Sequence, residues 1–145
     1  MKQIALCHPL AKMPVRSTEG SSGLDIHSVD ETFILQPGTR KLVRTGLKIK
    51  YSPNLVMLIQ PRSKLANKFG IQILAGVGDS DYLGEYGVIL YNSGIMPLEV
   101  KQGDPIAQIV FYHADREDLV LVDEAELGTS ERGEKGIHDA ETRLL

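Results

Sequence analysis

Residues 86–112 read YGVILYNSGIMPLEVKQGDPIAQIVFY, and this stretch decides the expected fold. It contains three short β-prone runs, Tyr86–Tyr91, Leu98–Lys101 and Ile106–Tyr112. Between them lie Asn92-Ser93-Gly94 and Gln102-Gly103-Asp104, whose residue types favour tight turns. Short strands at regular spacing are typical of a sandwich, barrel or jelly roll, and they argue against alternating strands and helices.

The same alternation of short runs and turns continues over the rest of the chain. Further strands are expected at Gly23–Val29, Thr32–Leu35, Lys41–Tyr51, Leu55–Gln60, Ile71–Leu74 and Leu119–Val122. One helix is expected at Ser63–Phe69, because Leu65, Ala66 and Phe69 recur at helical spacing behind a serine that can cap it. The sequence therefore predicts an all-β fold, a jelly-roll-like barrel or sandwich with one short helix.

Composition limits the classes of function. The chain has 145 residues, 42% of them hydrophobic and 24% charged, which suits one globular domain. Its net charge of −3 provides no basic excess for general nucleic-acid binding, although a small anionic ligand needs only a few local Arg or Lys side chains. The single cysteine, Cys7, excludes an intramolecular disulfide. Since no targeting signal or membrane span is recognised, we expect a cytoplasmic, intracellular protein.

The last segment differs in composition. We expect a β domain over residues 1–123, followed by an arm over residues 124–145 that is mostly charged or small, with Leu and Ile in no clear period. Such a segment buries little apolar surface and is expected to be mobile by itself. It is either a solvated end or a functional arm, and composition alone does not decide between them.

The sequence motifs of several common catalytic and binding sites are absent. The chain lacks a GxxxxGK[ST] loop, a complete GxGxxG, an HExxH and a CxxC pair. A zinc centre is disfavoured because the histidines are scattered, at His8, His27, His113 and His138. Adjacent residues on a strand face opposite sides, which argues against a Cys7–His8 nucleophile, and Cys7 is expected to be a small buried residue.

The densest group of unusual residues is the run from Ala75 to Glu85, AGVGDSDYLGE. One interpretation is a tight turn in which Asp79 or Asp81 makes local hydrogen bonds to the backbone. The other is a glycine-bounded hairpin whose backbone, at Gly76, lets a flat ligand approach while one carboxylate faces a water. A carboxyl group is suited to act as a general base, since it ionises at about pH 4 and its carboxylate accepts a proton from a metal-polarised water.

Two further patches are candidates for ligand contacts. Residues 61–66, PRSKLA, place the guanidinium of Arg62, the hydroxyl of Ser63 and backbone N–H groups at the expected helix N-terminus, which is an anion-binding arrangement. Residues 103–108, GDPIAQ, are consistent with an ordinary turn into a strand, in which only Gln108 is unusual. Each patch alone is more often structural than functional.

Taken in order, these patches resemble the five motifs of the trimeric dUTPases. The series is Ser22-Gly-Leu-Asp25-Ile26, residues 61–66, residues 75–85, residues 103–108 and Arg132-Gly-Glu-Lys-Gly136. The third and fourth motifs are specific, whereas the first and fifth are weak by themselves. The resemblance implies a jelly-roll homotrimer that hydrolyses dUTP to dUMP and pyrophosphate, with each active site built from three subunits.

The resemblance also implies a role for each matching residue. Asp79 matches the carboxylate that activates the water attacking the α-phosphorus, and Asp25 matches a supporting acid. Tyr82 matches the ring that packs on the deoxyribose and leaves no room for a 2′-hydroxyl. Arg62, Ser63 and Gln108 match the groups that hold the phosphate chain. Further substrate contacts are expected at Lys64, Gly76, Arg132 and Ile137. The resemblance also implies that Mg²⁺ binds through the triphosphate and water with few direct protein ligands, so no metal-binding residue is predicted.

Four positions depart from the family pattern. Lys64 replaces a small residue beside the phosphate-binding serine. Gly78 replaces the branched apolar residue before the base, which is expected to loosen the aim of Asp79. Leu83 stands where Arg or another polar residue is common. Ile137 stands in place of an aromatic lid over the uracil, and because base–aromatic stacking contributes roughly 1–3 kcal/mol, weaker closure is expected.

Two other functions stay open on the sequence alone. A non-catalytic nucleotide-binding or regulatory protein with the same fold is favoured by Lys64 and the altered arm, and is opposed by Asp79, Tyr82 and Gln108. A dCTP deaminase-like enzyme is opposed by the Asp-Ser-Asp-Tyr run at residues 79–82, which resembles the hydrolases.

Overall fold

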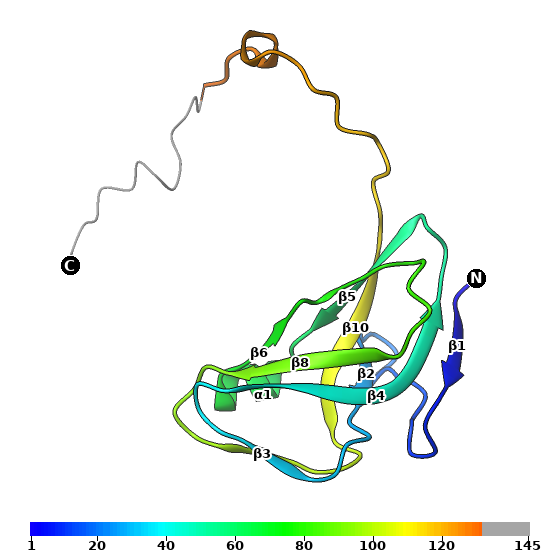
Figure 1. The fold of residues 1–145 in the computed structure, drawn as a ribbon, viewed down its shortest axis with the longest axis vertical. Helices are drawn as coiled ribbons and strands as arrows, with labels where there is room; N and C mark the ends of the chain where they lie inside the picture. The colour runs from blue at the N-terminus through cyan, green and yellow to red at the C-terminus, as the bar shows by residue number, and fades with distance from the viewer. Residues whose placement is uncertain (132–145) are drawn as a thin grey trace, which may run out of the picture. The chain divides into compact units, whose positions relative to one another are not determined.

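The computed structural model describes residues 1–131 of the chain (Figure 1). The chain forms a compact unit, Met1–Asp115, and a second unit, Arg116–Leu145. The first unit ends at Asp115, before the boundary that composition suggested after residue 123. Within residues 1–131, no helix has the length and apolar character needed to cross a membrane.

The described residues form ten β-strands, one α-helix and one 3₁₀ helix. In chain order they are β1 (Gln3–Leu6), β2 (Leu24–His27), β3 (Phe33–Leu35), β4 (Arg40–Lys50), β5 (Leu55–Gln60), α1 (Ser63–Phe69), β6 (Ile71–Leu74), β7 (Val77–Gly78), β8 (Tyr86–Asn92), β9 (Leu98–Val100), β10 (Pro105–His113) and η1 (Glu124–Leu127). This confirms the prediction of an all-β fold with one short α-helix.

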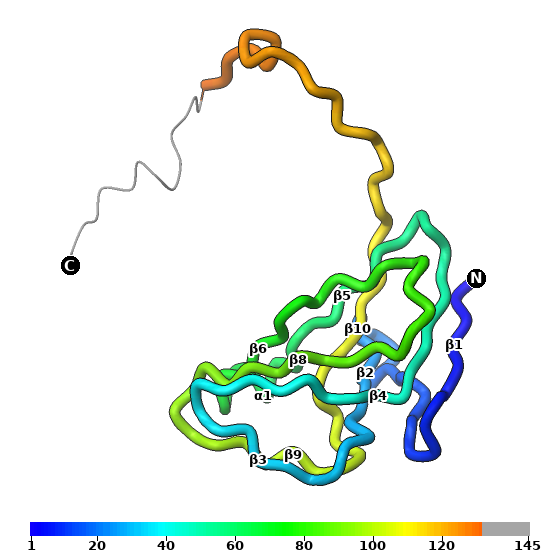
Figure 2. The backbone as a smooth tube through the Cα atoms, viewed as in Figure 1, coloured from blue at the N-terminus to red at the C-terminus, as the bar shows by residue number. Residues whose placement is uncertain are grey.

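Two four-stranded sheets and one two-stranded sheet build the first unit. The paired strands β4 and β8 run side by side in Figure 2. Their strand orders are β1-β4-β8-β6, β2-β10-β5-β7 and β3-β9. Side chains from both large sheets are buried in one core, among them Val43, Leu90, Met57 and Ile109. The two large sheets therefore pack as the layers of a β-sandwich.

The burial pattern of β8 shows why this sequence forms strands. Every second residue is buried, namely Tyr86, Val88, Leu90 and Asn92, while those between them are half-buried. Successive side chains on a strand face opposite sides, so this alternation places one face of β8 on the core. The turn predicted at Asn92-Ser93-Gly94 begins at the last residue of β8, and the chain continues from it to β9.

The helix α1 has the predicted bounds but not the predicted cap. Leu65 and Phe69 pack against the core, as their spacing indicated. Arg62 is the N-cap residue, with extended backbone, and no side chain makes a capping hydrogen bond. The expectation that Ser63 caps the helix is wrong, because Ser63 is already the first helical residue.

Three other features differ from the sequence-based expectations. Residues 119–122 form no strand, since no described strand pairs with them and a strand needs a partner for its backbone hydrogen bonds. The strands β1 and β7 were not predicted. Cys7 is exposed, not buried, because it follows the edge strand β1, in which only Ile4 is partly buried.

Candidate active site

Asp25 and Arg62 form the centre of a polar cluster. Arg62 follows β5, and its guanidinium donates from Nε to Oδ1 of Asp25 at 3.0 Å and from Nη2 to Oδ2 at 2.9 Å. The hydroxyl of Ser17 also donates to Oδ2, at 3.1 Å. Only 27% of the Arg62 side chain and 16% of the Asp25 side chain are exposed. The two-pronged pair therefore gives the guanidinium a fixed orientation.

Gln108 connects this ion pair with the end of β5. In the antiparallel ladders, Gln108 of β10 lies opposite Asp25 of β2 and opposite Gln60 of β5. Its Nε2 donates to the carbonyl oxygen of Pro61 at 2.9 Å. A Cβ on Gly23 would lie 2.0 Å from Oε1 of Gln108, so a side chain there would displace the amide from its present position. The unusual glutamine thus joins the first, second and fourth motifs.

A cavity of about 220 Å³ opens at this cluster. Its lining consists of Ser17, Asp25, Arg62, Ser63, Lys64 and Gln108. A broader hollow of about 550 Å³ shares Gln108 and is lined by Ser21, Ser22, Gly23, Gln60, Pro61, Val110 and Tyr112. The smaller cavity presents a guanidinium, an ammonium, hydroxyls and an amide, which are donors suited to an anionic group.

The segment between β6 and β8 changes sheets. β6 and β8 pair with each other, whereas β7 pairs with β5 of the other large sheet. Ala75 turns the chain with a φ of +53°, and the carbonyl of Gly76 accepts a hydrogen bond from the N–H of Ile59 at 2.7 Å. A Cβ on Gly76 would lie 2.6 Å from the carbonyl oxygen of Ile59. Gly76 is therefore needed for a close backbone contact within the chain itself.

Asp79 and Tyr82 lie on a tight turn after β7. The N–H of Tyr82 donates to the carbonyl oxygen of Asp79 at 3.2 Å, and the Tyr82 hydroxyl donates to the carbonyl of Glu85 at 3.0 Å. The ring of Tyr82, 48% exposed, packs edge-on against Tyr86 with centroids 5.1 Å apart. Asp79 is exposed. The turn thus presents a carboxylate and an aromatic ring to the surroundings.

Glu85 fixes the end of this segment to β4. Its Oε1 accepts a hydrogen bond from the N–H of Gly46 at 2.9 Å, and its Oε2 accepts one from Nη2 of Arg44 at 3.1 Å. Gly46 has a left-handed φ of +68°, where the β4–β8 register shifts. Burial opposes ionisation of Glu85, but these hydrogen bonds outweigh it and lower the pKa of the carboxyl. Glu85 therefore stays ionised and bonded at neutral pH.

The predicted site residues fall into two groups within one chain. Asp25, Arg62, Ser63, Lys64 and Gln108 line one cavity, and Gly76, Asp79 and Tyr82 are not among its lining residues. The two remaining predictions, Arg132 and Ile137, lie outside the described residues. Within residues 1–131, the proposed base and the proposed phosphate contacts thus do not share this cavity.

Comparison with protein families identifies the family of this chain. Residues 10–140 match the family model described as dUTPase, which is most of the chain. The chain belongs to the dUTPase family. The first four motifs, which the structure places on β2, α1, the β7–β8 segment and β10, all lie within the matched residues.

Curated relatives and solved structures agree with this dUTPase assignment. A deoxyuridine 5'-triphosphate nucleotidohydrolase of Haemophilus influenzae (strain PittEE) is 43% identical over 128 residues, covering 86% of this chain and 83% of the relative. One from Anaeromyxobacter sp. (strain Fw109-5) is 41% identical over 130 residues, covering 88% and 86%. A mutant Staphylococcus bacteriophage 80alpha dUTPase with dUpNHpp superposes with a TM-score of 0.83 at 26% identity, over 94% of this chain and 95% of that chain.

A further structural neighbour supports the fold alone. A mutant dUTPase from phage phi11 of S. aureus, described with a structural Mg(II) ion, has a TM-score of 0.79 at 24% identity and covers 87% of this chain and 99% of that chain. The dUTPase fold of the present chain is therefore seen in proteins whose sequences have diverged considerably.

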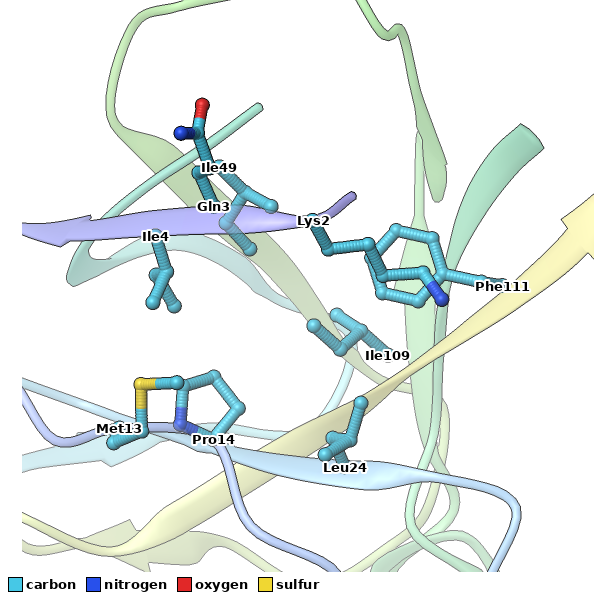
Figure 3. Close-up of a pocket in the computed structure, with 9 residues that line it drawn as sticks. All are labelled: Lys2, Gln3, Ile4, Met13, Pro14, Leu24, Ile49, Ile109 and Phe111. Atoms are coloured by element: carbon cyan, nitrogen blue, oxygen red, sulfur yellow. The ribbon is translucent and has the colours of Figure 1, made fainter. Parts of the chain in front are cut away.

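The dUTPase chain also has an apolar cavity, of about 190 Å³, that the sequence did not predict (Figure 3). It is lined by Lys2, Gln3, Ile4, Met13, Pro14, Leu24, Ile49, Ile109 and Phe111. The ammonium of Lys2 lies 4.6 Å from the centroid of the Phe111 ring. No lining residue carries a carboxylate or a hydroxyl, so this cavity offers no such group as a general base or nucleophile. It went unpredicted because β1, which forms one wall, was missed.

The polar groups of the dUTPase site fit a metal ion that binds together with the substrate and is held by its phosphates. Residues 1–131 contain no group of three or more His, Cys, Asp or Glu side chains that could hold a metal ion. Mg²⁺ keeps several waters and usually binds through one or two carboxylates and substrate phosphates, not through an all-protein cage. The cavity around Arg62 offers donors for phosphate oxygens, which would themselves carry the ion.

Proposed function

We propose that the protein hydrolyses dUTP to dUMP and pyrophosphate by attack of water on the α-phosphorus. The observation that carries this proposal is the cavity at the Asp25–Arg62 pair, where Arg62 and Lys64 supply positive charge and Ser63 and Gln108 supply neutral groups. Phosphate oxygens accept strong hydrogen bonds from a guanidinium whose orientation is fixed. Membership of the dUTPase family supports a deoxyuridine nucleotide as the substrate.

Asp79 is the proposed general base. Its carboxylate takes a proton from the attacking water, whose oxygen bonds to the α-phosphorus as the bond to the bridging oxygen of pyrophosphate breaks. Arg62, Ser63 and Lys64 hold the phosphate chain, so that charge developing on the leaving pyrophosphate is stabilised where it forms. Mg²⁺, held by the triphosphate and water, would add positive charge at the same place.

The proposed enzyme is a homotrimer with shared sites. Within residues 1–131, β1, β6, β2 and β7 lie at the edges of the two large sheets, and closed symmetric oligomers cover such edges. A neighbouring subunit would bring Asp79 and Tyr82 to the Arg62 cavity. Arg132 would grip the terminal phosphate and Ile137 would cover the uracil. The proposed setting is a reducing, intracellular one, since the chain has one cysteine.

Incubation with Mg²⁺ and either dUTP or dCTP, with the products separated by chromatography, tests this function. We expect dUMP and pyrophosphate from dUTP and no product from dCTP, because the proposed site provides no deamination chemistry. Binding of dUTP without any dUMP would identify a non-catalytic nucleotide-binding protein. Formation of dUTP from dCTP would identify a deaminase, and either result would contradict the proposal.

Tyr82→Ala should narrow the preference for dUTP over UTP by about 10–100-fold, the range expected when a steric contact of this size is lost. The half-exposed ring is proposed to lie against C2′ of the deoxyribose, where it leaves no room for a hydroxyl. The measurement is the ratio of kcat/KM for the two nucleotides. Tyr82→Phe is the matched control, because it keeps the ring and removes only the hydroxyl bonded to the Glu85 carbonyl. If the ratio of kcat/KM for dUTP and UTP is unchanged in Tyr82→Ala, another residue excludes the 2′-hydroxyl.

A further inference from the structure

Two buried tyrosines contact the backbone on either side of Asp79. Tyr51 follows β4 and Tyr86 begins β8, and their exposed fractions are 4% and 7%. The hydroxyl of Tyr51 donates to the carbonyl oxygen of Gly78. The hydroxyl of Tyr86 donates to the carbonyl oxygen of Asp79 at 2.8 Å. Two consecutive carbonyl groups are thus held by two side chains, one that follows β4 and one from β8.

A side chain at Gly78 would have to displace the end of the Met57 side chain. A Cβ there would lie 2.6 Å from Cε of Met57 and 3.1 Å from the ring of Tyr86. The sequence suggested that glycine at this position loosens the aim of Asp79. In the structure Gly78 is buried, and Met57 and Tyr86 occupy the space beside it. The residue before Asp79 is therefore fixed by contacts to its backbone, in place of a side chain of its own.

Tyr86 also contacts the second proposed substrate residue of this segment. Its ring meets that of Tyr82 edge-on, at an interplanar angle of 80°. Burial raises the pKa of the Tyr86 and Tyr51 hydroxyls, so both stay protonated and able to donate well above neutral pH. One buried side chain thereby joins the carbonyl of Asp79 to the ring of Tyr82.

We propose that Tyr51 and Tyr86 are positioning residues, which fix the peptide groups of Gly78 and Asp79 and so aim the Asp79 carboxylate at the attacking water. This inference rests on the proposed function, in which Asp79 is the base. Because the carbonyl groups of Gly78 and Asp79 are both held, the Asp79 carboxylate has fewer orientations available. Because misplacement of a reacting group by about 1 Å costs roughly 10²-fold in rate, losing both hydroxyls should slow the chemical step.

Tyr51→Phe, Tyr86→Phe and the double variant test the inference, since Phe keeps each ring and removes only the hydroxyl. Each single variant should lower kcat by about tenfold and the double variant by about 10²-fold, with KM for dUTP within about twofold of the parent. Tyr91→Phe, at a half-buried tyrosine of β8, is the matched control and should leave kcat unchanged. Steady-state kinetics supply kcat and KM, and melting temperatures record any loss of folding.

The same substitutions in an Asp79→Asn background separate positioning from a general structural effect. If Tyr86 acts through Asp79, Tyr86→Phe should change the residual rate of that background by less than about twofold. An equal loss of kcat in the parent and in the Asp79→Asn background, or an unchanged kcat in the double variant, would overturn this inference. Neither result would contradict the proposed function. Should Tyr86→Phe fail to fold, Tyr51→Phe decides by the same comparison. If Asp79→Asn itself keeps the parent rate, the proposed base is wrong and the inference fails with it.

Discussion

Asp79→Asn should lower kcat for dUTP hydrolysis by about 10²–10⁴-fold, the range that loss of a positioned general base produces. Asparagine keeps the size of the side chain but cannot take the proton from water. Asp79 is exposed, so the change should leave the melting temperature and the affinity for the nucleotide nearly unchanged. The measurement is kcat and KM with dUTP, together with nucleotide binding to the inactive variant.

Asp81→Asn is the matched comparison, because it removes the same charge from another exposed carboxylate on the same turn. We expect a smaller loss of kcat there than at Asp79. If Asp81→Asn is the slower of the two variants, the general base is Asp81. If Asp79→Asn hydrolyses dUTP within a few-fold of the parent, the proposed mechanism does not hold.

Most strands were predictable because their signals are local. β5 and α1 have the predicted bounds, Leu55–Gln60 and Ser63–Phe69, and Pro61 separates them. The two-residue strand β7 has no such signal: half of it is glycine, and its pairing with β5 is decided by tertiary contacts. The run 119–122 shows the opposite error, since its residues favour a strand but no described strand pairs with it.

The residues of the site were predictable from the sequence, but their arrangement in space was not. Asp25 and Arg62 were each singled out, yet their ion pair joins residues 37 positions apart. They meet because β10 lies between β2 and β5, with Gln108 opposite a residue of each. No motif encodes that register. The partners of Tyr51 and Tyr86 were missed for the same reason, since a strand tyrosine does not indicate which carbonyl its hydroxyl meets.

Two inactive variants should restore hydrolysis when they are mixed, if each active site is shared between subunits. Asp79→Asn removes the base, whereas Arg62→Gln weakens the phosphate contact but keeps a donor for Asp25. Each variant alone should lose at least about 10²-fold in kcat. With equal amounts and random assembly, about a quarter of the sites would combine an intact Asp79 with an intact Arg62, so up to about a quarter of the parent activity should return.

The physical basis for this expectation is the separation of the two groups in one chain. The cavity holding Arg62 is not lined by Asp79 or Tyr82, whereas β7, which leads into Asp79, is an edge strand and can present its turn to a neighbour. Co-expression of differently tagged variants isolates the mixed trimers, in which about one site in three would be intact, and two Asp79→Asn chains with different tags serve as the control. If light scattering shows mixed trimers and no activity returns, both groups act from the same chain. A monomer mass at micromolar concentration would contradict the shared site directly, because no second subunit could then complete the cavity.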